Sequence, residues 1–180
     1  MEKLRYDEIT GKFIPVTLSA PQYCTVSQND LDKNLDRMAE EIIPLLNPSP
    51  EGTDWEIWIP MAIYGHTGCK IPDNVINASL RQIGVVFGGA NVVKSVDGLW
   101  LNREGEHSYL YSEANHNITI ELQGMNGADV DKISKILAET LGAIFQQLSV
   151  LVVLRPVYST FHNTMKNNVE LEEKTPSDSD

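Results

Sequence analysis

The stretch Phe145-Gln-Gln-Leu-Ser-Val-Leu-Val-Val-Leu154 joins the last turn of an expected helix directly to an apolar segment with strand character. It closes a longer region, Trp55 to Thr160, whose hydrophobic periods alternate between those of strands and helices. In order along the chain, this region reads as strand, helix, strand, strand, helix and strand. That order decides the expected fold.

The individual elements of this region are predicted from the period of its hydrophobic residues and from the prolines and glycines that interrupt them. Trp55 to Tyr64, Ala90 to Leu101 and Tyr109 to Gln123 have strand character, although Pro60 requires an unpaired or bulged position in the first of them. Helices are expected from Pro72 to the Gly88-Gly89 pair and from Asn126 to Phe145. The sequence predicts an α+β fold, a ferredoxin-like plait (βαββαβ) with a four-stranded antiparallel sheet and two helices on one face.

The final strand, expected from Leu148 to Leu154, is nearly all apolar. Such a strand is typical of the middle of a sheet covered on both faces. Two helices on one face leave the other face open, so we expect a cover. Either a second copy of the chain or a fold-back of residues 1–50 would supply it.

The remaining residues flank this domain. Ser27 and Asp30 predict a helix start, a stripe from Leu31 to Ile43 continues it, and Pro44 ends it. Lys12 to Leu18 is at best an edge strand or an extended arm, because Pro15 interrupts it. We therefore expect an N-terminal arm and helix over 1–53, the ferredoxin-like domain over 54–160, and a disordered acidic tail over 161–180.

Composition limits the classes of function. The chain has 180 residues, of which 42% are hydrophobic, enough for a real core. Its formal net charge is −11, which opposes binding to nucleic acid or to anionic membranes. The sequence therefore predicts no nucleic-acid partner and no membrane partner, and the acidic surface suits a basic protein.

The two cysteines, Cys24 and Cys69, are too few for a disulfide scaffold and form no CxxC pair. The N-terminus lacks the apolar core of a secretory signal, and the longest apolar run is far short of a membrane span. A reduced, cytoplasmic protein is the expectation.

Three features together resemble a family of small bacterial proteins of unknown function with a ferredoxin-like domain. These are the turn glycines Gly65 and Gly68, the Gly98-Leu-Trp100 triplet, and Phe145-Gln-Gln147-Leu-Ser149-Val-Leu151, which matches a Phe-x-Gln-x-Ser-Val-Leu motif. The resemblance covers about half the chain. Phe87-Gly-Gly-Ala-Asn91 departs from the Pro-rich approach to the second strand in that family. The resemblance implies a fold and no activity.

Candidate catalytic residues are few. His66 and Cys69 lie three apart in a glycine loop, and a nearby imidazole can activate a thiol. A zinc site there would need further ligands, and no other Cys/His pair has ligand spacing. His116 is a third candidate, but its parity separates it from Glu113 and Glu121 on the same strand. The sequence predicts no metal and no cofactor.

Trp100, Tyr109 and Tyr111 are the candidate binding residues, because they lie on neighbouring expected strands. Aromatic side chains on an open sheet can stack nucleic-acid bases, but the acidic charge favours core or subunit packing instead.

We therefore expect a non-catalytic cytoplasmic interaction module that self-associates through its sheet and binds a protein partner. The alternative is a small enzyme of the dimeric α+β-barrel type, with a pocket between the sheets of two subunits. His66, His116, Trp100 and Tyr111 would be the residues to mutate in that case.

Overall fold

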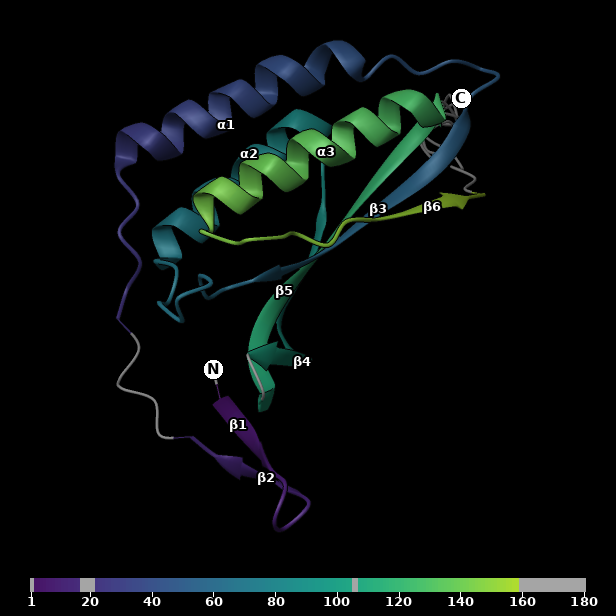
Figure 1. Ribbon diagram of the computed structural model, residues 1–180. Helices are drawn as coiled ribbons and strands as arrows, with labels where there is room; N and C mark the ends of the chain where they lie inside the picture. Colours follow the sequence, from purple (N-terminus) through teal and green to yellow (C-terminus); the bar gives the residue numbers. More distant parts are fainter. Residues whose placement is uncertain (1, 17–21, 105–106, 159–180) are drawn as a thin grey trace, which may run out of the picture.

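The structure, a computed structural model, describes residues 2–16, 22–104 and 107–158. Of residues 2–3, 95, 97–104 and 107–113, only the backbone is described. The expected acidic tail, 161–180, lies outside the described residues. The elements, drawn in Figure 1, are β1 (Glu2–Asp7), β2 (Lys12–Pro15), α1 (Gln28–Ile42), the short 3₁₀ helix η1 (Ile43–Leu45), β3 (Thr53–Ala62), α2 (Asp73–Phe87), β4 (Asn91–Glu104), β5 (His107–Met125), α3 (Gly127–Ile144) and β6 (Val153–Val157).

The predicted fold class is wrong. The described part of the chain has three helices, and its elements run β-β-α-β-α-β-β-α-β, not βαββαβ. Six strands are hydrogen-bonded in the order β2-β1-β5-β3-β6, and β4 also pairs with β5. The N-terminal hairpin adds two strands: β2 lies within the segment expected as an edge strand or extended arm, whereas the sequence pattern did not indicate β1.

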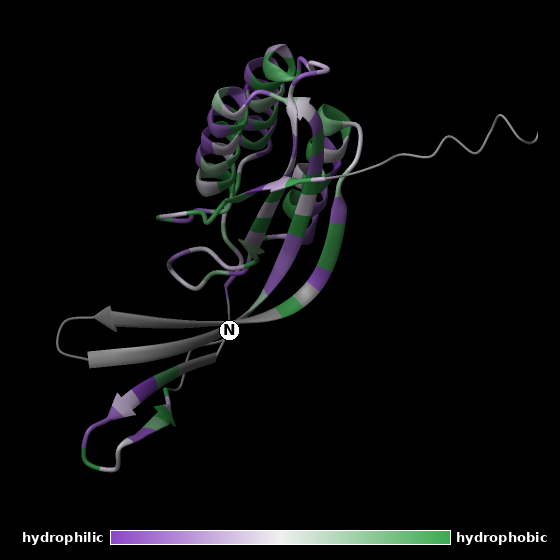
Figure 2. Ribbon diagram, turned by 90° about the vertical axis from the view of Figure 1, so that its right-hand side faces the viewer, coloured by the Kyte–Doolittle hydropathy of each residue, from purple (hydrophilic) through white to green (hydrophobic). Residues whose placement is uncertain are grey.

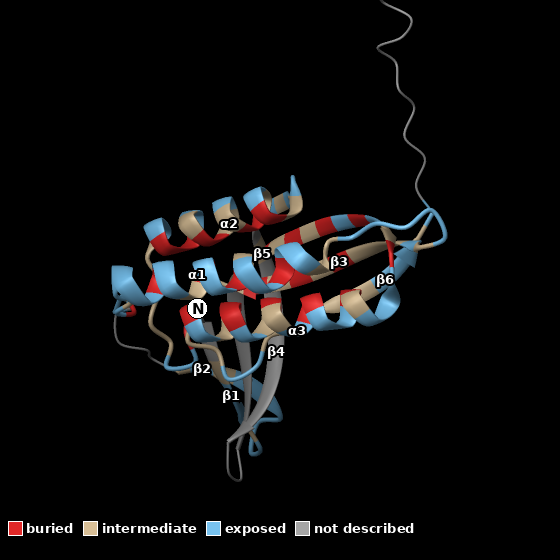
Figure 3. Cartoon of the chain, turned by 90° about the horizontal axis from the view of Figure 1, so that it is seen from above, coloured by how far each residue is buried: buried red, intermediate tan, exposed pale blue. Residues whose placement is uncertain are grey.

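The three helices lie together on one side of the sheet. Ser27 caps α1, its hydroxyl oxygen accepting from the Asp30 amide at 3.1 Å, as the sequence predicts. The buried face of α1 contacts α3 and α2, and α1 lies on the side of these helices that faces away from the sheet (Figures 1 and 3). That buried face consists of Leu31, Leu35, Met38 and Ile42.

The core lies between the sheet and the helices. On β3, Ile57 and Ile59 are fully buried, and Ile118 and Ile120 are their partners on β5. Figure 3 shows buried residues along the inner faces of the helices and exposed residues along their outer faces. This half of the sheet follows the alternation expected of strands with one covered face.

The other half of β5 projects away from the helices. Its residues 109–112 pair with β1 on one side, and residues 107–115 pair with β4 on the other. Figure 1 shows these strand ends and the β1–β2 hairpin extending below the helical layer, and Figure 2 shows the hairpin apart from the helices. We call these parts the arm: β1, β2 and the paired ends of β4 and β5 (residues 97–113). The rest of the described chain is the body.

The final strand differs from its prediction. β6 begins at Val153, pairs only with β3, and forms an edge of the sheet. Leu148 and Leu151 precede it in a non-regular segment and are 86% and 50% exposed. The apolar run was misread because a short apolar segment has no period that separates a buried strand from a loop.

Residues 28–45 do not supply the cover that was expected for the open face of the sheet. α1 contacts helices, and residues 2–15 lie in the arm. Pro60 lies opposite Asn117 of β5, and among the described strands β6 pairs with residues 54–58 of β3 only, so Pro60 has a neighbouring strand on the β5 side alone. Within the described ranges, no helix is both long and apolar enough to cross a membrane.

Candidate functional site

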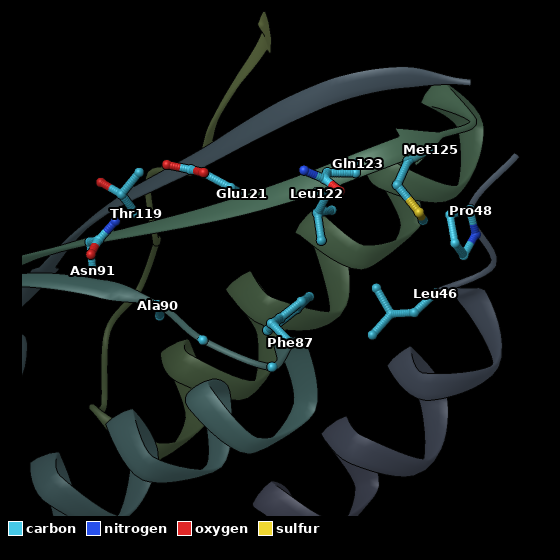
Figure 4. A pocket seen from close by; sticks show the side chains of 12 residues that line it. Leu46, Pro48, Phe87, Ala90, Asn91, Thr119, Glu121, Leu122, Gln123 and Met125 are labelled. Atoms are coloured by element: carbon cyan, nitrogen blue, oxygen red, sulfur yellow. The ribbon is translucent and has the colours of Figure 1, made fainter. Parts of the chain in front are cut away.

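A pocket of about 720 Å³ opens where the ends of α1 and α2 approach β5 (Figure 4). Its volume is in the range of pockets that hold small molecules or short peptide segments. It is lined by Leu46, Pro48, Phe87, Gly88, Gly89, Ala90, Asn91, Thr119, Glu121, Leu122, Gln123 and Met125.

One wall of the pocket is apolar. Figure 4 shows Leu46, Phe87, Leu122 and Met125 directed toward a common space beside β5. Leu122 and Met125 are buried against the core, whereas Leu46 and Phe87 are half-buried. α2 ends at Phe87 because Gly88 adopts a left-handed conformation, with φ of 73°. This termination brings Phe87 to the rim of the pocket.

The other wall is polar and contains one charged side chain, Glu121. Thr119 and Glu121 lie on the opposite side of the β5 ribbon from the apolar wall (Figure 4). Register places Glu121 directly opposite Glu56 of β3. Arg155 of β6 binds Glu56, with Nη1 3.2 Å from Oε1, whereas Glu121 is exposed and has no cationic partner among the described residues. Two like charges directly opposite each other in a sheet are unfavourable. Glu121 therefore lies opposite a like charge, and no described cation offsets it.

The pocket also exposes a strand edge. β4 begins at Asn91, which pairs with Thr119, so residues 120–123 of β5 have no strand on the β4 side. Farther along, the Ser49 amide donates to the Gly124 carbonyl oxygen at 2.7 Å. Gly52 also lies so close to Gly124 that a Cβ there would be 1.9 Å from this oxygen. The edge is thus open over four residues and closed at both ends.

The predicted catalytic pair His66 and Cys69 lies elsewhere, in the loop between β3 and α2. Cys69 forms a disulfide with Cys24, so the expectation of two reduced cysteines is not met, and Cys69 is not a free thiol. Sequence spacing could not reveal this bond, because 45 residues separate the two cysteines.

The exposed His66 side chain is tied to the end of α3. Its backbone amide and its Nδ1 atom donate to the Gln146 carbonyl oxygen at 3.0 and 2.6 Å. Gln146 has a φ of 51°, which is unusual for a residue other than glycine. Its side-chain amide donates to the Thr25 carbonyl oxygen at 3.0 Å. His66 and Gln146 therefore connect three loop segments.

The residues of the Phe-x-Gln-x-Ser-Val-Leu motif belong to this structural junction. Phe145 is fully buried at the end of α3, and the Gln147 side-chain amide donates to the Tyr64 carbonyl oxygen. These contacts hold the loop after β3 against α3. They give Phe145 and Gln147 a structural role and assign them no chemistry.

His116 is buried on β5, opposite Met61 of β3. It is not brought together with His66 and Cys69: in the part of the chain that the structure describes, no three His, Cys, Asp or Glu side chains gather as a metal site would require. The parity argument also holds here, because Glu121 is exposed on the open face and His116 is not.

The predicted binding residues Trp100, Tyr109 and Tyr111 lie in the arm. Register places Trp100 opposite Tyr111, and Tyr109 between Asn102 of β4 and Arg5 of β1. The three positions are therefore brought together at the level of the backbone, on adjacent strands.

Sequence reasoning missed the pocket. The sequence predicts a helix end at Gly88-Gly89. In the structure, these glycines also place the start of β4 at Asn91, so that the edge of β5 beyond Thr119 stays open. Leu46 and Pro48 line the pocket because α1 packs on α2 and α3. No local sequence pattern predicts that packing.

The chain matches no family model and no curated protein. A solved structure described as a phage SAM lyase in complex with S-methyl-5'-thioadenosine is similar to it, with 19% sequence identity and a TM-score of 0.43. The match covers 61% of this chain and 84% of that one. At this TM-score, the similarity assigns neither a fold nor a function.

Proposed function

We propose that this chain is a non-catalytic cytoplasmic interaction module that associates with itself through its sheet and binds a protein partner with basic residues. Self-association is assigned to the arm. Partner binding is assigned to the acidic surface of the body.

The observation that carries this proposal is the exposed apolar surface of the β1–β2 hairpin. Tyr6 and Phe13 are each 38% exposed and form an edge-to-face pair with ring centroids 5.4 Å apart. Ile9, in the turn between the strands, is 96% exposed. Aromatic and aliphatic side chains gathered on a projecting hairpin are typical of an interface.

The strand edges of the arm support the same proposal. β2 pairs with β1 alone, so its other edge is unpaired among the described strands. An edge strand with unpaired backbone groups is a template for pairing with another chain. A second copy could therefore add to the sheet at β2 and cover Phe13.

The composition of the pocket supports binding. Glu121 is the one titratable side chain in its lining, and the other lining residues are apolar or uncharged.

The oligomeric state tests self-association. We expect the full chain to elute as a dimer or larger species in size-exclusion chromatography with light scattering. Replacing Ile9 and Phe13 together by serine should shift the population toward monomer. Val85→Ser is the matched control, because Val85 is an exposed apolar residue (69%) on α2 of the body.

A strict monomer at every concentration would contradict the self-association part of the proposal. An equal shift with Val85→Ser would remove the assignment to the arm.

A further inference from the structure

The open edge of β5 has the features of a peptide-binding groove. We infer that residues 120–123 of β5 receive an extended segment of a partner protein that alternates apolar and basic residues. This inference rests on the partner-binding part of the proposed function and is independent of self-association through the arm.

The backbone supplies the first argument. β3 pairs with one side of β5 at Ile120, Glu121 and Leu122, and no described strand pairs with the other side of these residues. In an antiparallel pair, alternate residues direct both their N–H and C=O groups to the same side. Some of these groups therefore face the pocket, where an added strand would bind them, as in other cases of β-strand addition.

The two closed ends fix the length of the segment. Asn91 blocks the strand edge at Thr119, and the Ser49–Gly124 hydrogen bond blocks it at Gly124. Four residues of a strand span about 13 Å at roughly 3.3 Å per residue. The groove thus fits a short segment and excludes a long strand, which limits uncontrolled edge-to-edge association.

The two faces of β5 determine the pattern of the segment. Side chains of an added strand that lie beside Leu122 would enter the apolar wall, next to Phe87 and Met125. Side chains at the intervening positions would lie beside Glu121 on the open face. Because successive residues of a strand alternate between faces, the pattern is apolar, basic, apolar.

Charge complementarity identifies the basic positions. Arg155 forms an ion pair with Glu56. Glu121 lies opposite Glu56 and has no cationic partner among the described residues. A lysine or arginine directly across from Glu121 would relieve the like-charge pair and contribute a favourable cross-strand contact. The net charge of −11 would speed the approach of such a segment.

The test uses the full chain and a fluorescein-labelled four-residue peptide, Val-Lys-Val-Lys, with an amidated C-terminus and with fluorescence anisotropy as the readout. The matched peptide carries glutamate in place of both lysines. We expect the lysine peptide to bind about tenfold more tightly than the glutamate peptide, the size of effect typical of a few favourable charge contacts.

Charge exchange locates the contact. Glu121→Lys should reverse the preference between the two peptides. Glu40→Lys, an exposed position on α1, makes the same change in net charge and should leave the preference intact. Equal effects of the two substitutions would show general attraction to an acidic protein and would overturn the site.

Backbone methylation separates strand addition from side-chain binding alone. Two methylated versions of the lysine peptide are compared, one with N-methyl groups on its odd-numbered residues and one with them on its even-numbered residues. One version should lose binding, because its methyl groups replace the N–H groups that face β5. The other should keep most of its binding. Equal binding by both methylated peptides would overturn pairing with β5.

The oligomer measurement distinguishes the possible failures. If the lysine peptide does not bind but the Ile9/Phe13 variant still dissociates, this inference falls and self-association stands. If the peptide binds a strict monomer, the reverse holds. If Glu121→Lys itself dissociates the oligomer, a second copy occupies the groove, and the assignment to a basic partner is wrong.

Discussion

The body and the arm share strand β5 but are stabilised in different ways. In the body, Ile118 and Ile120 are fully buried under the helices, and β3 pairs beside them. In the arm, strands β1 and β4 flank β5, and none of the described helices covers it (Figure 1). Burial of apolar area is the main source of stability, so one continuous strand passes from a region held by its core to a region held mainly by pairing.

The largest expected effect contrasts an aromatic residue in each region. Phe145→Ala should lower the free energy of unfolding by about 4 kcal/mol, because it opens a cavity in the core. Phe13→Ala in the arm should cost less than about 1 kcal/mol, because Phe13 is already partly exposed. Urea denaturation followed by circular dichroism measures both. Similar costs at the two positions would break the distinction between body and arm.

The disulfide lies in the segment that leads from the arm to α1. Bonding Cys24 to Cys69 closes a loop across 45 residues, which should stabilise the folded state by about 3 kcal/mol through the entropy of the unfolded chain. Thermal unfolding with and without reductant measures this contribution, and Cys24→Ser with Cys69→Ser should match the reduced protein. No effect of reductant on the midpoint would show that this bond does not form in solution.

Gly52 tests the close approach between the residue before β3 and the end of β5. An added Cβ would be 1.9 Å from the Gly124 carbonyl oxygen, and the neighbouring backbone would have to move. Gly52→Ala should therefore cost about 2 kcal/mol in denaturant unfolding, a typical penalty for overpacking. Gly84→Ala is the control, because no atom lies within 4 Å of its added Cβ. Equal results for the two would place the close contact in doubt.

The smallest expected effect concerns pH and the turn of the arm. The Thr10 hydroxyl donates to Asp7 Oδ2 at 2.7 Å, and the Ile9 amide donates to Oδ1 at 3.1 Å. These bonds, the Thr10 contact first, hold the pKa of Asp7 below its ordinary value of 3.8. A lowered carboxyl pKa gives stability that is present above the unfolded value and is lost as pH falls through the folded value.

We therefore expect the β1–β2 turn to loosen in acid while the body stays folded. A carboxyl NMR titration should give a lowered pKa for Asp7, and Thr10→Ala should raise that pKa toward its ordinary value. An unchanged pKa in Thr10→Ala would contradict the role of the hydroxyl.

Local signals predicted the body better than the arm. Ser27 capped α1 as expected, and the Gly88-Gly89 pair ended α2, because caps and glycine turns depend on neighbouring residues alone. The strands near 55–64, 90–101 and 109–123 were found from their period, with boundaries shifted by a few residues. The fold class was wrong because the pairing of β1 with residues 109–112 connects segments that lie far apart in the sequence.

The candidate site was almost entirely missed. His66 and Cys69 were candidates because an imidazole can activate a nearby thiol. In the structure, His66 binds a carbonyl oxygen and Cys69 is bonded to a second cysteine. Leu46, Phe87 and Glu121 were not predicted to form one site, because each is ordinary in its own local context. Their significance depends on three elements meeting at one strand edge.

The sequence by itself determined the three helices, strands β3, β4 and β5 and the acidic charge, since periodicity, caps and net charge are local or additive properties. Tertiary structure alone decided that Cys24 meets Cys69, that β6 is an edge strand, and that four residues of β5 are open beside an apolar wall. These outcomes depend on contacts between segments tens of residues apart, and such contacts are selected by the packing of the whole chain.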